Sequence, residues 1–179
     1  MKIIFLGPPG SGKSTQAKLL AEHIGAPYIE MSQLLRIKMD GSDSDAIAIK
    51  KAMKEGTLVP DKIVIRLLHE RLENPDCKNG YILDGFPRSK EQLEGLPAGI
   101  EKVFYITLTD GQSIERLLKR GRVDESAQII KRRLDIYHDL TEPVLHHFKD
   151  LGILTEVDGE PSIEEINQKI KSIVKNGKE

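Results

Sequence analysis

The sequence has almost no cysteine, no long hydrophobic run and no excess of charge of either sign. Cys77 is the only cysteine, which excludes an internal disulfide and a zinc site built from several cysteines, and is typical of a reducing compartment. The 27 Lys and Arg residues balance 28 Asp and Glu residues to a net charge of -1, which indicates neither a nucleic-acid nor a membrane-surface binder. The apolar run Ile3–Leu6 is too short for a secretory signal or a membrane span. We therefore expect a cytoplasmic protein.

Two kinds of segment, one short and apolar and the other longer and amphipathic, alternate along the 179 residues. Short apolar runs followed by longer amphipathic stretches predict an α/β fold, with a five-stranded parallel sheet that carries helices on both faces. A chain of this length predicts a single domain over residues 1–179. The expected strands are Lys2–Leu6, Pro27–Glu30, Tyr81–Asp84, Lys102–Leu108 and Ile153–Val157. The expected helices are Lys13–Ile24, Lys62–Leu72, Lys90–Leu96, Ile114–Lys119, Ala127–Asp150 and Ile163–Val174.

Residues 31–73 interrupt this alternation. They offer about 40 residues of helical pattern where a crossover between parallel strands needs only a dozen or so, so we expect a helical insertion. Gly41-Ser42-Asp43 predicts a turn with a helix N-cap, and Gly56 to Pro60 predicts a second turn before a helix that begins at Asp61. Further along, Pro143 should break or kink the helix expected over Ala127–Asp150.

A glycine-rich loop follows the first strand. Gly7-Pro8-Pro9-Gly10-Ser11-Gly12-Lys13-Ser14 satisfies the pattern G-x-x-x-x-G-K-[ST] in full. Its glycines allow consecutive backbone N–H groups to surround a phosphate, Lys13 brings a charge to the β- and γ-oxygens, and Ser14 can ligate Mg²⁺. The loop therefore predicts nucleotide binding. The residues expected to bind ATP here are Gly10, Ser11, Gly12, Lys13, Ser14 and Thr15.

A second motif, Asp84-Gly85-Phe86-Pro87-Arg88, follows the third strand. An aspartate at the carboxyl end of such a strand can reach the Mg²⁺ shell, and an arginine beyond it can clamp a second phosphate. The D-x-x-G and N-K-x-D strings of GTPase switches do not occur in the sequence. The motifs therefore favour a kinase over a GTPase.

The sequence resembles the adenylate kinases of the nucleoside-monophosphate kinase family. Gly7 to Gln16 matches the family's G-x-P-G-[SA]-G-K-[GS]-T-Q, Leu58-Val59-Pro60 matches L-[VI]-P, and Asp84 to Arg88 matches D-G-[FY]-P-R. The resemblance implies Mg²⁺-dependent transfer from ATP to AMP by a monomer, with the monophosphate bound by the insertion. Arg36 and Arg88 would hold the acceptor phosphate, and Gln92 would bond its adenine. The AMP-binding residues implied are Ser32, Arg36, Leu58, Val59, Gly85, Arg88 and Gln92.

The family also carries arginines around a short lid. Gly121-Arg122-Val123-Asp124-Glu125 is similar to the family's G-R-x-D-D, Arg133 follows at the family's spacing, and Arg116 and Arg120 precede it. Residues 120–125 would form a minimal lid turn, with no room for a lid domain or for zinc-binding cysteines. The segment around Glu160 resembles the family's contact with the donor adenine, so Arg116, Arg120 and Glu160 would bind ATP. The catalytic residues implied are Lys13, Arg88, Arg120, Arg122 and Arg133, and those implied for Mg²⁺ are Ser14 and Asp84.

One departure from the family leaves the acceptor base open. Where the insertion normally starts with a small hydroxyl residue, Gly and Asp, this chain has Met31-Ser32-Gln33. The alternatives are a kinase for a pyrimidine monophosphate, a kinase for a small metabolite, and a regulator that hydrolyses or senses ATP. Gln92 favours AMP over the first, the two acceptor motifs argue against the second, and the arginine set favours transfer over sensing.

Overall fold

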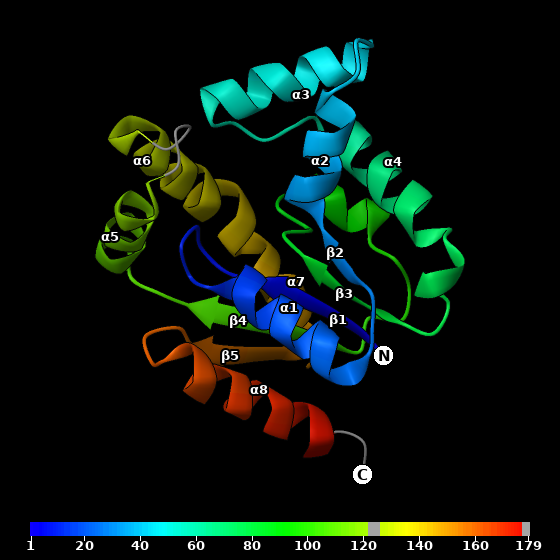
Figure 1. Cartoon of the computed structure of the whole chain (residues 1–179), viewed down its shortest axis with the longest axis vertical. Coiled ribbons are helices and arrows are strands. Elements are labelled where there is room, and N and C mark those ends of the chain that lie inside the picture. The colour runs from blue at the N-terminus through cyan, green and yellow to red at the C-terminus, as the bar shows by residue number, and fades with distance from the viewer. Residues whose placement is uncertain (122–125, 177–179) are drawn as a thin grey trace.

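A five-stranded parallel sheet forms the centre of the molecule (Figure 1) in the order β2-β3-β1-β4-β5. The computed structural model describes residues 1–121 and 126–176. The predicted α/β fold class is confirmed, and each expected strand lies within two residues of an observed one. The strands are β1 (Lys2–Leu6), β2 (Tyr28–Glu30), β3 (Tyr81–Asp84), β4 (Lys102–Thr107) and β5 (Leu154–Asp158).

Alternate residues of the strands face two separate layers of helices. Ile3 and Phe5 pack toward α1 (Lys13–Ile24) and α8 (Ile163–Asn176), which lie on one face of the sheet. Ile4 and Leu6 belong to the core that includes α4 (Asp61–Leu72) and α7 (Leu145–Asp150). This alternation is the two-residue period of a strand, and burial on both faces explains why residues 3–6 of β1 are all apolar. Among the described residues, no helix combines the length and the apolar character needed to cross a bilayer.

Three helices occupy most of residues 31–73. They are α2 (Met31–Met39), α3 (Ser44–Glu55) and α4, and α2 and α3 stand above the carboxyl edge of the sheet (Figure 1). As expected, Asp43 caps α3, since its side chain accepts a hydrogen bond of 2.9 Å from the Ala46 N–H. Gly56 ends α3 in the left-handed conformation with φ 66°. These two residues fix where α3 begins and ends.

Two helix predictions need correction. The expected helix over Lys90–Leu96 is instead a 3₁₀ helix, η2 (Glu91–Gly95). Its last residue, Gly95, lies so close to α4 that a Cβ would stand 2.5 Å from Ile65 Cγ2, and Pro97 follows shortly after, so a longer α-helix does not fit.

The expected long helix over Ala127–Asp150 is interrupted. It consists of α6 (Ala127–Ile136), the π turn η3 (Tyr137–Thr141), the 3₁₀ turn η4 (Glu142–Val144) and α7. The break at Pro143 confirms the prediction, because proline lacks the N–H that a continuous helix needs. Helix α5 (Asp110–Arg120) begins four residues earlier than expected because Thr109 and Gln112 form a capping box. A further 3₁₀ turn among the described residues is η1 (Pro75–Cys77).

Candidate active site

The glycine-rich loop lies between β1 and α1 at the centre of the sheet's carboxyl edge. There β1 is flanked by β3 and β4, and at such a reversal of strand order open α/β sheets bind their ligands. A Cβ on Gly7 would stand 2.5 Å from the Ile106 carbonyl oxygen, so no larger residue fits. Gly12 has φ 86° with nothing within 4 Å of a Cβ, so its backbone conformation, and not crowding, requires glycine. The loop thus packs closely on β4 at Gly7.

Lys13 lies at the centre of a ring of charged side chains. Its Nζ donates a long hydrogen bond of 3.4 Å to the Pro8 carbonyl. Burial of the amine is the main cause that lowers the pKa of Lys13 to about 8; the positive charges of Arg88, Arg133 and Arg120 act in the same direction, and Asp84 opposes them. The three arginines come from separate elements: Arg88 from the segment between β3 and η2, Arg120 from α5 and Arg133 from α6. Such a cluster of positive charges around one lysine is suited to a polyanion.

A cavity of about 560 Å³ opens in front of this ring, within the usual size of a small-molecule site. We call it the central cavity. It is lined by the glycine-rich loop, α2, the turn before α4, the segment after β3, and helices α5 and α6. The lining includes most of the residues predicted to bind ATP, AMP or Mg²⁺: Gly10, Gly12, Lys13, Ser14, Thr15, Ser32, Arg36, Leu58, Val59, Asp84, Gly85, Arg88, Gln92, Arg116, Arg120 and Arg133.

Two of the predicted residues that the structure describes, Ser11 and Glu160, do not line the central cavity. Ser11 is buried beneath the loop, and its hydroxyl has no hydrogen-bond partner within the described ranges. Glu160 is exposed, and its carbonyl accepts a hydrogen bond of 3.5 Å from Arg116. Its neighbour Gly159 packs against the loop, since a Cβ there would stand 3.1 Å from the Ser11 carbonyl oxygen. Arg122 lies outside the described residues.

The residues predicted to hold Mg²⁺ pass a test of fit. Asp84 is only 3% exposed, and its Oδ1 has no hydrogen-bond partner among the described residues. Burying a carboxylate oxygen without a partner is costly, so this atom is suited to a cation or to its bound water. The described residues contain no group of three or more His, Cys, Asp or Glu placed to hold a metal by themselves. Asp84 and Ser14 therefore fit an ion that shares its coordination with phosphate oxygens and water.

Arg88 and Gln92 also line the central cavity, and both are held in place by hydrogen bonds. The Arg88 Nε donates a hydrogen bond of 2.8 Å to the Gly85 carbonyl, and the Thr141 hydroxyl donates one of 2.8 Å to the Arg88 carbonyl. The Gln92 amide is already bonded, because Oε1 accepts from the Arg88 N–H at 2.8 Å and Nε2 donates to Asp61 at 2.8 Å. Gln92 must exchange at least one of these partners to bond a base.

Sequence reasoning missed a polar group on β2. Glu30 lines the central cavity and pairs in register with Asp84 on the neighbouring strand. Its carboxylate accepts a hydrogen bond from the Ser32 hydroxyl, and Tyr28 reaches both Glu30 and Asp84. Burial raises the pKa of Tyr28, and the neighbouring carboxylates raise it further, so its hydroxyl remains a proton donor. The sequence did contain a signal for Glu30, because this residue ends an expected strand, and ligands bind at the carboxyl edge of a parallel sheet.

Comparisons with known proteins identify the family. A model of the adenylate kinase family matches residues 5–153. The chain is 40% identical to adenylate kinase 1 of Nostoc sp. over 178 residues, which cover 96% of this chain and 97% of that protein. The chain belongs to the adenylate kinase family. The adenylate kinases of Leptospira biflexa (strain Patoc 1 / Ames) and Prochlorococcus marinus (strain MIT 9211) are 40% and 37% identical to it, over 96% of this chain and 99% and 95% of theirs.

Membership settles the class of reaction. The family transfers a phosphoryl group from ATP to AMP and forms two molecules of ADP, so this chain is a nucleotide phosphotransferase with a P-loop kinase fold. The GTPase, metabolite-kinase and sensor interpretations are thereby set aside. The roles of individual residues, the metal and the preferred bases belong to the proposal that follows.

Proposed function

We propose that the central cavity catalyses the reversible, Mg²⁺-dependent reaction of ATP with AMP by direct in-line transfer. The observation that carries the proposal is the ring around Lys13, where Arg88, Arg120 and Arg133 lie close enough to alter its pKa. Lys13 and the three arginines place four positive charges together, which complements the negative charge that spreads over a phosphoryl group during its transfer. We include Arg122 in this set on the resemblance alone.

The donor and the acceptor would approach from opposite sides of this ring. The backbone N–H groups of residues 10–15 would hold the β- and γ-phosphates of ATP, and Arg116 with the Glu160 segment would lie near its base. Arg36 and Arg88 would grip the AMP phosphate, and its base would lie against Leu58, Val59 and Gln92. Mg²⁺, held with ATP by Ser14 and Asp84, would neutralise charge on the β- and γ-oxygens.

The reaction needs no general base from the protein. An AMP phosphate oxygen, already anionic at neutral pH, forms a bond to the γ-phosphorus, and the bond from that phosphorus to the β,γ-bridging oxygen breaks. The departing ADP keeps the electron pair. The protein contributes positioning and a preorganised field, which account for most of the catalysis in such transfers.

A panel of acceptors tests this function. Purified protein is incubated with ATP and Mg²⁺ plus AMP, GMP, CMP or UMP, and the nucleotide products are separated by chromatography. We expect ADP to form fastest with AMP. Faster transfer to CMP or UMP would instead favour a pyrimidine-monophosphate kinase, which the Met31-Ser32-Gln33 departure leaves open. ADP formation at the same rate without an acceptor would indicate hydrolysis.

The setting of the reaction is part of the same proposal. We place it in the cytoplasm, supported by the single Cys77, and assign it to a monomer of one domain acting on free nucleotides. Light scattering of the purified protein with and without nucleotides measures the oligomeric state, and a mass near 20.1 kDa is the expected result.

A further inference from the structure

A tyrosine outside the motifs lies between the two side chains proposed for Mg²⁺. Tyr28 is on β2, two residues before Glu30, and its ring packs into the apolar layer between the sheet and α1. Its hydroxyl donates a hydrogen bond of 2.9 Å to Asp84 Oδ2. The Ser14 side chain lies near the same hydroxyl, where it lowers the pKa of Tyr28 against the larger effects of burial and Asp84. The phenol is thus bonded to Asp84 and lies beside Ser14.

The Tyr28 hydroxyl determines which oxygen of Asp84 remains available. Oδ2 is bonded to Tyr28, whereas Oδ1 is buried and has no partner among the described residues. Glu30 Oε2 lies 3.5 Å from the same hydroxyl, and since a phenol has a single proton, the shorter contact to Asp84 takes it. The Glu30 carboxylate is held separately by Ser32.

We infer that Tyr28 is a positioning residue for the metal, which fixes the Asp84 carboxylate through Oδ2 so that Oδ1 faces the ion or its water. The inference rests on the proposed Mg²⁺ site. Partners that bond the far side of a ligand orient it, and their removal typically weakens metal affinity by about 10- to 100-fold. A rigid aromatic ring anchored in a packed core suits this role, because it leaves the hydroxyl little freedom to move.

The test compares Tyr28→Phe with three other variants. Mn²⁺ serves as the probe, and its free concentration is followed by electron paramagnetic resonance in the presence of protein and the β,γ-imido analogue of ATP, with the analogue alone subtracted. We expect Tyr28→Phe to weaken Mn²⁺ binding in the ternary complex about tenfold. The affinity for the analogue in EDTA should stay unchanged, which a general loss of structure would not allow.

The other variants separate the explanations. Tyr105→Phe removes a hydroxyl on β4, which β3 and β1 separate from β2, and whose bond among the described residues is to Tyr137; it should leave Mn²⁺ affinity unchanged. Glu30→Gln removes the neighbouring charge but keeps the bond from Tyr28 to Asp84, so its effect should be smaller than that of Tyr28→Phe. An equal or larger loss in Glu30→Gln, or wild-type affinity in Tyr28→Phe, would overturn the inference. If Asp84→Asn also binds Mn²⁺ normally, the proposed metal site itself is wrong.

Discussion

At the scale of single residues, the central cavity holds charges that are unfavourable without a ligand. Lys13 is the clearest case, because burial and three arginines destabilise its charged form and lower its pKa to about 8. In the free protein these positive charges repel one another, and a bound polyphosphate would relieve the repulsion. This trade of stability for function is typical of active sites.

Lys13→Ala is expected to separate activity from stability. Removing one preorganised charge from a transferring group typically costs about 3 kcal/mol or more, which lowers turnover by about two orders of magnitude. The melting temperature without nucleotide should stay within a few degrees of wild type or rise slightly, since the variant no longer buries a charge. Calorimetry and a coupled ADP assay measure the two effects, and near-normal turnover would refute the assignment.

The lowered pKa of Lys13 also predicts a pH dependence. In the free protein the amine loses its proton as the pH rises through about 8, so kcat/KM for ATP should fall above that pH, because this ratio reports groups of the free enzyme. Bound phosphates favour the charged amine, so kcat should persist to higher pH. The sign for stability is opposite, since deprotonation relieves the burial of charge and stabilises the fold between about pH 8 and 10.5. A kcat/KM that stays flat to pH 10 would show that Lys13 remains charged.

Arg88 and Gln92 should give variants that differ in kind. Arg88→Ala is expected to reduce transfer to every monophosphate, because all acceptors share the phosphate that we propose it binds. Gln92→Ala should mainly reduce the preference for AMP over UMP and CMP, because an amide reads the base edge. Asp61 retains its bond of 2.9 Å from Ser89 when Gln92 is removed, which limits the structural cost. Equal losses with all four acceptors for Gln92→Ala would show that it does not read the base.

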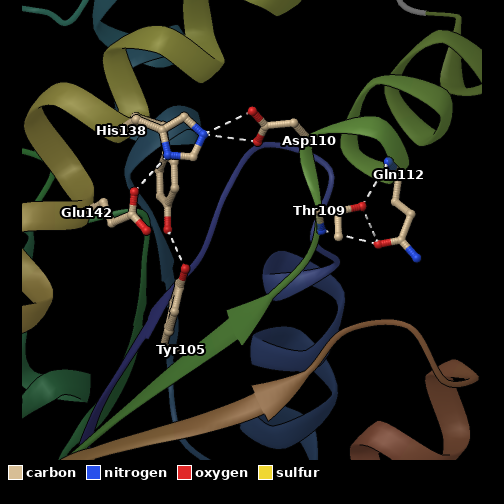
Figure 2. Close-up of polar contacts among 7 residues, drawn as sticks. Tyr105, Thr109, Asp110, Gln112, His138 and Glu142 are labelled. Atoms are coloured by element: carbon tan, nitrogen blue, oxygen red, sulfur yellow. Dashed lines mark hydrogen bonds and ion pairs between the residues drawn. The ribbon is translucent and has the colours of Figure 1, made fainter.

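At the scale of elements, a histidine joins two segments near the cavity's arginines. His138 in η3 contacts Glu142 in η4 through Nδ1 at 2.7 Å and Asp110 at the start of α5 through Nε2 at 2.9 Å (Figure 2). Helix α5 carries Arg120, and α6, which carries Arg133, runs directly into η3. Hydrogen bonds from the imidazole to these two acidic side chains raise its pKa, and only the imidazolium can donate to both carboxylates.

Stability should therefore depend on pH through His138. Because the folded pKa is raised, the stabilisation is fully present below the unfolded pKa of about 6.5 and is lost as the pH rises through the folded value. His138→Ala should lower the melting temperature by a few degrees at most near pH 6, since partly exposed ion pairs contribute about 1 kcal/mol or less, and the difference should vanish near pH 9. The matched control is His146→Ala, at an exposed position on α7. An equal difference at both pH values would contradict an ionic role.

At the scale of the whole molecule, the short segment between α5 and α6 limits how many side chains are available to contact the base of the proposed donor nucleotide. Helix α5 ends at Arg120 and α6 begins at Ala127, so the chain has no room there for a lid domain. In the proposed arrangement the loop and the arginines contact the phosphates, which all nucleoside triphosphates share. The segment near Glu160 is left as the main candidate for contact with the base.

Donor selectivity should accordingly be modest. We expect GTP, CTP and UTP to replace ATP within roughly tenfold in kcat/KM at fixed AMP, a difference of about 1.4 kcal/mol. A donor series followed by chromatography of the products measures this. Preference for ATP above about a hundredfold would mean that another part of the chain, or a second copy, closes over the base.

The sequence by itself determined the parts of this protein that depend on local signals. The strands, the glycine-rich loop before Lys13 and the break at Pro143 follow from short-range patterns of apolar residues, glycine and proline. Only the tertiary structure decided which side chains meet across the chain. Tyr28 bonds Asp84 from 56 residues away, and Gln92 bonds Asp61 from 31. No local pattern encodes such contacts, because they arise when strand order and helix packing bring separate segments to one edge of the sheet.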